Sequence, residues 1–203
     1  MKIICVGRNY LDHIREMNNE IPEEPQIFLK PDTSYLPDKG VFNIPSFATN
    51  LQYEAEIVLK ISKQGKNIPE TEAKLYFNEL TIGIDFTERD LQAQLLNKKL
   101  SWELSKAFDD SAAVGKFINV SSFENIYNFD FHFTQNGSIV QKSNVNQLVF
   151  NFYYLISFVS VYFTLHPGDL IFTGTPSGIG RVYPDDQLEG YIANQKLLQI
   201  TVK

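Results

Sequence analysis

Cysteine is nearly absent from this sequence, because Cys5 is the only one among 203 residues. It has no partner for an internal disulfide, so the chain fits a reducing compartment and we expect it in the cytoplasm. Positive charge is also scarce, with 18 Lys and Arg against 24 Asp and Glu. The net charge of −6 lacks the basic footprint of a nucleic-acid-binding protein, so we expect no nucleic-acid partner.

Long hydrophobic runs are few, and neither of the two candidates predicts an export or membrane segment. Residues 1–7 are too short for a signal-peptide core and are expected to form a first strand. Residues 148–165 are barely long enough to span a bilayer, include Asn, Ser and Thr, and have no strongly basic flank. We expect a buried helix there that runs into a strand, with a turn at 166–169 and no membrane contact.

Glycine-rich phosphate loops are missing as well. The one glycine-rich segment, 174–180, has neither the Gly-Lys-Ser/Thr of a P-loop nor the glycine spacing of a dinucleotide fingerprint. Its backbone amides, with the hydroxyls of Thr173 and Thr175, could hold a small carboxylate. A plain turn between two strands would have the same composition.

Aromatic residues are abundant, and sixteen Phe with ten Tyr favour a β-rich fold. The length suits one domain over 1–203 with a large core, and no repeat or linker divides it. We predict an α+β fold with a hairpin over 131–140, turning at Asn136-Gly137. A short helix capped by Asn9 or Asp12 is expected next to the first strand. A capping box at 87–90 should open a helix that buries Leu91, Leu95, Leu96 and Leu100.

Three carboxylates are the strongest candidates for a functional site. Residues 50–61 alternate like a strand and put Glu54 and Glu56 together, opposite the apolar side chains. Their Cα atoms would lie roughly 6.6 Å apart, where two anions repel by about 2.5 kcal/mol at an effective dielectric of about 20. Asp85 ends a second strand, 80–85, opposite its isoleucines. Hard oxygen ligands suit Mg²⁺ or Mn²⁺ rather than zinc, although a solvated strand face would show the same pattern.

A possible base and a possible anion-binding group accompany the carboxylates. His13 and Glu16 are three residues apart, so on a helix they can hydrogen-bond, as a water-activating base needs. Lys106 could bind a substrate carboxylate or stabilise an enolate. An exposed helix and an ordinary surface lysine are the alternatives. We expect His132 and His166 to be structural, and Trp102 to lie in the core.

Six blocks of the sequence, taken in order, resemble the fumarylacetoacetate hydrolase family, in its short, single-domain branch of acylpyruvate hydrolases and oxaloacetate decarboxylases. The blocks are ICVGRNYLDHIREM (4–17), IFLKP (27–31), YEAE (53–56), IDFTERDLQ (84–92), SWELSKAFD (101–109) and LHPGDLIFTGTPSGIG (165–180). The resemblance implies a mixed β-roll, usually a homodimer, that acts on a small 2-oxo acid with Mg²⁺ or Mn²⁺. It implies metal ligands Glu54, Glu56 and Asp85, substrate-binding residues Arg8, Gln92, Thr175 and Gly174, and catalytic residues His13, Glu16 and Lys106.

The resemblance also implies a reaction: hydrolysis of a 3-acylpyruvate of the fumarylpyruvate or acetylpyruvate type to pyruvate and a carboxylic acid, through a metal-stabilised enolate. Oxaloacetate decarboxylation and isomerisation of a related 2-oxo diacid are alternatives, because both also pass through an enolate. A non-enzymatic metal-binding module is a further alternative, against which the His13–Glu16 pair argues. Tyr53, Ser101 and Asp185-Asp186 depart from the family pattern, which bears on the substrate pocket.

Overall fold

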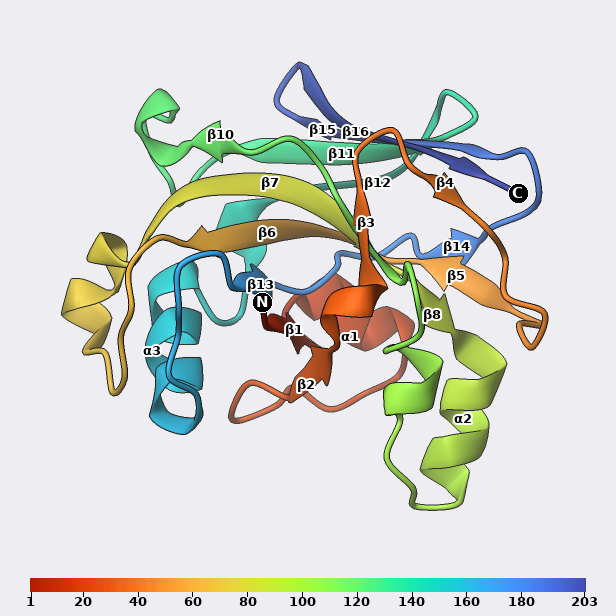
Figure 1. Cartoon of the computed structure of the whole chain (residues 1–203), viewed down its shortest axis with the longest axis horizontal. Coiled ribbons are helices and arrows are strands. Elements are labelled where there is room, and N and C mark those ends of the chain that lie inside the picture. The colour runs from red at the N-terminus through yellow and green to blue at the C-terminus, as the bar shows by residue number, and fades with distance from the viewer.

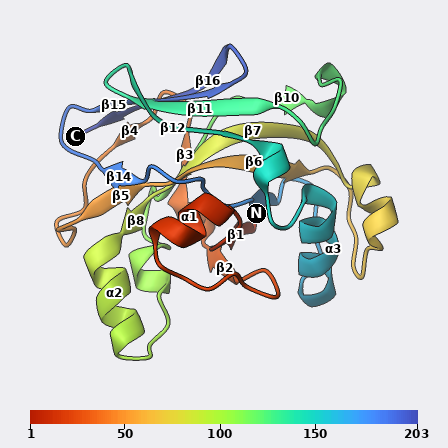
Figure 2. The same ribbon diagram turned by 180° about the vertical axis from the view of Figure 1, so that it is seen from behind.

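Two large β-sheets pack face to face, and the main hydrophobic core lies between them (Figure 1). The structure is a computed structural model that describes residues 1–203. Three α-helices lie outside the sheets, and the view from behind shows α1 in front of β1 (Figure 2). They span Leu11–Glu16 (α1), Arg89–Asn97 (α2) and Phe152–Tyr162 (α3). Strands predominate over helices, which confirms the predicted β-rich α+β fold.

The eight-stranded sheet contains most of the strands around the candidate metal site. Its order is β2-β1-β13-β6-β7-β9-β3, and β10 pairs with β7. The sheet is mixed, because β1–β13 and β3–β9 are parallel pairs and the others are antiparallel. Its strands span Ile3–Val6 (β1), Ile27–Lys30 (β2), Tyr35–Pro37 (β3), Ala55–Ile61 (β6), Phe77–Asp85 (β7), Ala112–Val114 (β9), Ile118–Asn119 (β10) and Leu170–Phe172 (β13).

The five-stranded sheet covers the other side of the main core in the order β12-β11-β15-β16-β4. Strands β11 and β12 form the predicted hairpin, and its turn is confirmed. Asn136 and Gly137 have φ values of 53° and 78°, the positive pair that a type I′ turn requires. The strands span Val41–Phe42 (β4), Asp130–Gln135 (β11), Ser138–Asn144 (β12), Gln187–Ile192 (β15) and Gln195–Val202 (β16).

A three-stranded sheet, β14-β5-β8, lies beside the large one. Its strands span Leu51–Tyr53 (β5), Thr87–Glu88 (β8) and Gly180–Arg181 (β14). The prediction of one strand over 50–61 is wrong, because the strand is interrupted at Glu54. Strand β5 pairs with β14 and β8, whereas β6 pairs with β7 and β13, so the chain changes sheets at this residue. It changes back just after Asp85, between β7 and β8.

The predicted starts of α1 and α2 are both wrong in detail. The N-cap of α1 is Tyr10, which makes no side-chain cap bond. Asn9 does not cap the helix, because its amide is hydrogen-bonded to residues 150 and 173. The N-cap of α2 is Glu88 rather than Thr87, and its carboxylate accepts from Leu91 N. Short 3₁₀ turns connect other elements at Asp32–Ser34, Glu70–Leu75, Glu103–Ser105, Val120–Ser122 and Val145–Gln147.

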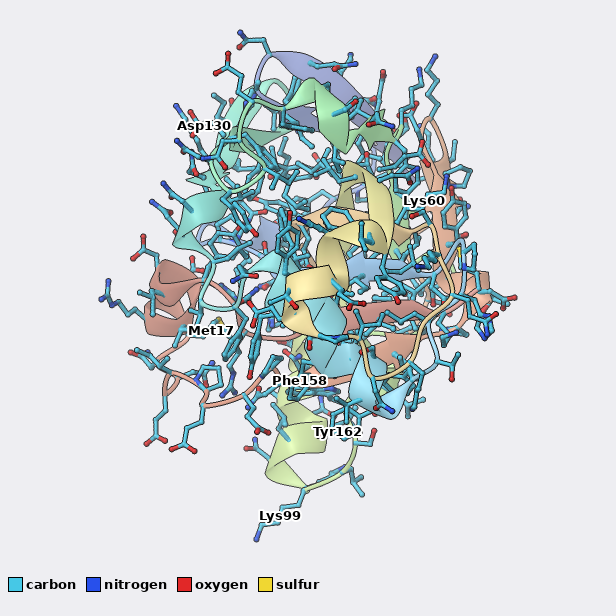
Figure 3. All side chains as sticks on the ribbon, turned by 90° about the vertical axis from the view of Figure 1, so that its left-hand side faces the viewer. Met17, Lys60, Lys99, Asp130, Phe158 and Tyr162 are labelled. Atoms are coloured by element: carbon cyan, nitrogen blue, oxygen red, sulfur yellow. The ribbon has the colours of Figure 1, made fainter.

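The predicted buried stripe of α2 is also wrong. The helix ends at Asn97, and within it only Leu95 is buried. Leu96 and Leu100 are 47% and 56% exposed, because α2 and the following loop extend away from the sheets (Figure 1). Lys99, which follows the helix, projects from the body of the molecule in the side view (Figure 3).

The apolar segment 148–165 forms the predicted helix, α3. Asn151 caps it by accepting hydrogen bonds from the backbone N–H groups of Tyr153 and Tyr154. One side of α3 is buried, whereas Tyr162 near its end lies at the surface (Figure 3). None of the helices combines the length and the apolar run that a membrane-spanning helix needs.

Alternate residues of the eight-stranded sheet face two different cores. Ile57 and Leu59 of β6 belong to a cluster of 34 buried residues that includes side chains of both large sheets. Val58 points the other way, into a smaller cluster of eight. Glu56 shares the side of Val58, because side chains alternate along a strand. The smaller cluster contains Ile3, Cys5, Phe28, Val58, Ala112, Val114, Leu170 and Phe172. The site carboxylates therefore continue the face of the smaller core.

Candidate active site

Three buried carboxylates meet where the chain passes between the two adjoining sheets. Glu54 lies at the break between β5 and β6, Glu56 lies in β6, and Asp85 is the last residue of β7. One oxygen from each carboxylate lies within 4.8 Å of the others. Pairing of β6 with β7 creates this proximity: Glu56 faces Gly83, and Asp85 N donates a 2.8 Å hydrogen bond to Glu54 O. The structure thus brings together the three residues predicted to bind a metal.

Three cationic side chains surround these carboxylates. Lys106 Nζ lies 2.8 Å from Glu54 Oε2 and 2.7 Å from Asp85 Oδ2. Arg89 donates through Nη2 to Glu54 Oε1. Lys30 Nζ lies 2.8 Å from Asp85 Oδ1, and both residues are almost completely buried. Two of the three carboxylates, those of Glu54 and Asp85, are therefore paired with cationic side chains.

The buried charges shift one another's pKa values in opposite directions. Burial alone would raise the pKa of Glu54, but Lys106 and Arg89 outweigh it and hold that pKa well below its usual range. Burial, followed by the charges of Asp85 and Glu54, raises the pKa of Glu56 well above its ordinary value. Burial would lower the pKa of Lys106, but the facing carboxylates Asp85 and Glu54 raise it instead. Lys106 therefore stays protonated at neutral pH.

The free oxygens of the cluster fit a divalent cation. Asp85 Oδ1 is buried and accepts no hydrogen bond, since its contact with Lys30 lacks hydrogen-bond geometry. Glu56 has no cationic partner, and the one donor to its carboxylate is Gly174 N, 2.6 Å from Oε2. A buried carboxylate without a counter-ion is unfavourable. Hard oxygen ligands of this kind match Mg²⁺ or Mn²⁺.

The predicted His13–Glu16 pair is formed on α1. His13 Nδ1 and Glu16 Oε2 are 2.9 Å apart, and His13 is buried while Glu16 is partly exposed. The other Glu16 oxygen accepts a 3.0 Å hydrogen bond from Gly178 N, which ties the helix to the glycine-rich loop 174–180. The loop also needs glycine at 174, where φ is +99° and a Cβ would lie 2.7 Å from Asn9 Cβ.

A cavity of about 120 Å³ brings several predicted site residues together. Its walls include Glu54, Arg89 and Trp102, so the tryptophan expected in the core partly lines the site. Thr175 and Gly174 do not line it: the Thr175 hydroxyl donates to Ala55 O, and Gly174 holds Glu56. Of the residues predicted to bind substrate or to act on it, the cavity is lined by Arg8, His13, Gln92 and Lys106.

Two site residues, Lys30 and Arg89, were not predicted to have a role. Lys30 is on the same face of β2 as Phe28, so an inward-pointing lysine on an apolar strand was the available signal. Arg89 begins α2 one turn before Gln92, and its Nη1 donates to Gln92 Oε1 at 2.7 Å. Both residues lie within sequence blocks that resemble the family. Their ion pairs, however, join residues far apart in the sequence, which no local pattern shows.

The sequence places this fold and site in a known family of proteins. The family model described as fumarylacetoacetate (FAA) hydrolase C-terminal matches residues 2–203. The chain therefore belongs to the fumarylacetoacetate hydrolase family.

Individual relatives are similar over nearly the whole chain. The mouse (Mus musculus) protein named oxaloacetate tautomerase FAHD1, mitochondrial, is 36% identical over 201 residues, which cover 99% of this chain and 91% of that protein. The Dictyostelium discoideum oxaloacetate decarboxylase, mitochondrial, is 40% identical over 184 residues, or 90% and 84% of the two chains. Fumarylpyruvate hydrolase from Pseudomonas aeruginosa, solved with Mn²⁺ and pyruvate, superposes with a TM-score of 0.92 at 33% identity, covering 100% and 90%.

Proposed function

We propose that this protein is a divalent-metal-dependent enzyme that hydrolyses a C–C bond in a 3-acylpyruvate, releasing pyruvate and a carboxylic acid. The observation that carries the proposal is the arrangement of the site. One cavity is lined by Glu54 of the buried carboxylate cluster and by His13, a histidine with its own carboxylate partner. The similarity to a fumarylpyruvate hydrolase solved with Mn²⁺ and pyruvate supports the reaction and the choice of metal.

The charge of the site favours a dianionic substrate. With all three ionised, as metal binding requires, Glu54, Glu56 and Asp85 carry three negative charges, and the three cations that contact the cluster, Lys30, Lys106 and Arg89, formally balance them. A divalent ion would add two positive charges to this neutral cluster. A 2-oxo acid with a second carboxylate would restore neutrality, and one with a single carboxylate, such as acetylpyruvate, would offset half of the added charge. Arg8, which lines the cavity and forms no ion pair, could receive the distal carboxylate.

His13 is suited to remove a proton from water. Its Nδ1 faces Glu16, so the tautomer with the proton on Nδ1 donates to that carboxylate and leaves Nε2 as the basic nitrogen. Glu16 is itself held by Gly178 N, which fixes the direction of the ring. General-base catalysis of this kind typically contributes about 10²- to 10⁴-fold.

Lys106 and Gln92 are suited to hold the 2-oxo acid end. The Lys106 ammonium is buried, remains protonated, and can stabilise the negative charge that develops on an enolate oxygen. Because the Gln92 oxygen accepts from Arg89, its NH₂ group is left to donate to a bound carboxylate. A divalent ion held by Glu54, Glu56 and Asp85 would act as a Lewis acid on the 2-oxo group.

Oxaloacetate is the second candidate substrate, because relatives at 36–40% identity are named for its tautomerisation or decarboxylation. Decarboxylation and tautomerisation need the enolate-stabilising groups but no attacking water. A metal-binding module without activity would retain the carboxylates yet release no product.

Product analysis separates these functions. Purified protein would be incubated with acetylpyruvate and, separately, with oxaloacetate, in Mn²⁺, in Mg²⁺ and in a chelator. We expect metal-dependent release of pyruvate and acetate from acetylpyruvate. Pyruvate release from oxaloacetate but not from acetylpyruvate would replace the hydrolase proposal with a decarboxylase. Interconversion of oxaloacetate tautomers without pyruvate release would identify a tautomerase.

A further inference from the structure

Gln141 is a buried amide that belongs to a different sheet from the metal-binding strands. It lies in the middle of β12, in the five-stranded sheet, and its side chain is 1% exposed. A buried amide is costly unless its polar atoms are paired. Its hydrogen-bond partners therefore indicate which segments of the protein it connects.

The Gln141 amide joins two segments of the candidate active site. Ala55 N donates to Gln141 Oε1 at 2.9 Å. In the other direction, Gln141 Nε2 donates to Thr175 Oγ1 at 2.9 Å and to Pro176 O at 2.8 Å. One end of the amide thus holds the strand between Glu54 and Glu56, and the other end holds the glycine-rich loop.

These bonds replace a β-ladder that has ended. Strand β13 pairs with β6 up to Phe172, which faces Val58, and Thr173 N still donates to Ile57 O. Beyond that point the glycine-rich loop departs from the sheet. The backbone of Ala55 is then satisfied by side chains: its N–H by Gln141 and its C=O by the Thr175 hydroxyl. The position of the strand at the two glutamates therefore depends on these side chains.

The loop segment that Gln141 holds lies between two contacts with the site. On one side, Gly174 N donates to Glu56 Oε2 at 2.6 Å. On the other side, Gly178 N donates to Glu16 Oε1 at 3.0 Å. Gly178 also packs directly on the backbone of Val140, the residue before Gln141. A shift of this loop would move the donors to both carboxylates at once.

We propose that Gln141 is a positioning residue that fixes the metal-binding carboxylates relative to the glycine-rich loop. The inference rests on the proposed function only in taking Glu54 and Glu56 as metal ligands. Loss of groups that orient metal ligands typically weakens metal binding about 10- to 100-fold. Gln141→Met keeps the length of the side chain and removes all three hydrogen bonds, so we expect it to weaken Mn²⁺ binding by that factor.

The test is Mn²⁺ titration calorimetry on the whole protein at a temperature where circular dichroism shows each variant to be folded. Ser143→Ala is the matched control. Ser143 lies two residues along on the same face of β12 and is similarly buried, but its hydroxyl donates to Gln147. It should bind Mn²⁺ like the wild type. A purely structural Gln141 would lower the melting temperature of Gln141→Met without changing its Mn²⁺ affinity.

Thr175→Val examines the same link from the loop and covers the case in which Gln141→Met does not fold. It removes the hydroxyl that bonds both Gln141 and Ala55 O, so we expect weaker Mn²⁺ binding in the same direction. Wild-type affinity in Thr175→Val and in any folded Gln141→Met would overturn the inference. Wild-type protein that binds Mn²⁺ but does not cleave acetylpyruvate would refute the proposed function alone. Wild-type protein that binds no Mn²⁺ would refute both.

Discussion

Removal of the Lys30 ammonium should destabilise the protein far more than removal of an exposed lysine in a similar ion pair. Lys30 is buried, lies 2.8 Å from Asp85 Oδ1, and donates 3.0 Å hydrogen bonds to Ser111 O and Ser111 Oγ. It also donates to Lys106 O. Lys30→Met keeps most of the aliphatic chain but removes one buried positive charge and leaves Asp85 Oδ1 without its cation. Asp85 Oδ2 keeps Lys106, and the Ser111 and Lys106 carbonyls keep other donors.

The expected cost follows from the burial of the pair. Removing one partner of a buried ion pair typically costs about 3–5 kcal/mol, because the remaining charge is left uncompensated. The structure offers a matched comparison in Lys60, which pairs with Glu79 at 2.7 Å. Both acidic partners lie in β7, but Lys60 and Glu79 are 36% and 34% exposed. Exposed pairs contribute about 0–1 kcal/mol, so Lys60→Met should be nearly neutral.

Urea unfolding in the presence of a chelator measures both variants without metal. We expect the free energy of unfolding to fall by about 3–5 kcal/mol for Lys30→Met and by less than about 1 kcal/mol for Lys60→Met. The slope against urea should be unchanged, so that the midpoint carries the effect. Equal losses in the two variants would show that burial does not make the Lys30–Asp85 pair more important for stability than the Lys60–Glu79 pair, and would refute this prediction.

Three further predictions concern the metal, the proton balance and assembly. Asp85→Ala should lose calorimetric Mn²⁺ binding, and an affinity equal to wild type would remove Asp85 from the ligand set. Because the raised pKa of Glu56 favours its protonated form in the metal-free protein, Mn²⁺ binding should release a proton and strengthen as pH rises. Calorimetry in buffers of different ionisation enthalpy measures that release, and identical heats in all buffers would contradict it. We also expect a homodimer, from the family resemblance, and sedimentation equilibrium showing only 23.3 kDa monomers at micromolar concentration would refute it.

The two-residue period of strands accounts for what the sequence predicted well. Alternation places Glu56 on the side opposite Ile57, and the same rule applied to 80–85 places Asp85 opposite its isoleucines. The hairpin was predictable because Asn136-Gly137 tolerates two successive positive φ values. In these cases the information lies within a few neighbouring residues.

The incorrect predictions involve contacts between distant residues. Asn9 resembles a helix cap in the sequence, but its amide holds Phe150 and Thr173, more than 140 residues away. Leu96 was predicted to belong to a buried helical stripe, yet it is 47% exposed and lines the cavity. The proposed role of Lys106 toward a substrate stays a prediction, but its ion pairs with two carboxylates of the cluster were missed. Tertiary contacts of this kind leave no local periodicity in a single sequence.

In the proposed function, His13 activates water at a metal-dependent site that cleaves a C–C bond. The most direct measurement is the kcat for pyruvate release from acetylpyruvate, with Mn²⁺ present, in wild type and in His13→Ala, together with the kcat for oxaloacetate decarboxylation. We expect His13→Ala to lose about 10²- to 10⁴-fold in hydrolysis and much less in any decarboxylation, which needs no water. Unchanged acetylpyruvate turnover in His13→Ala would contradict it and leave the proposed hydrolase without a base.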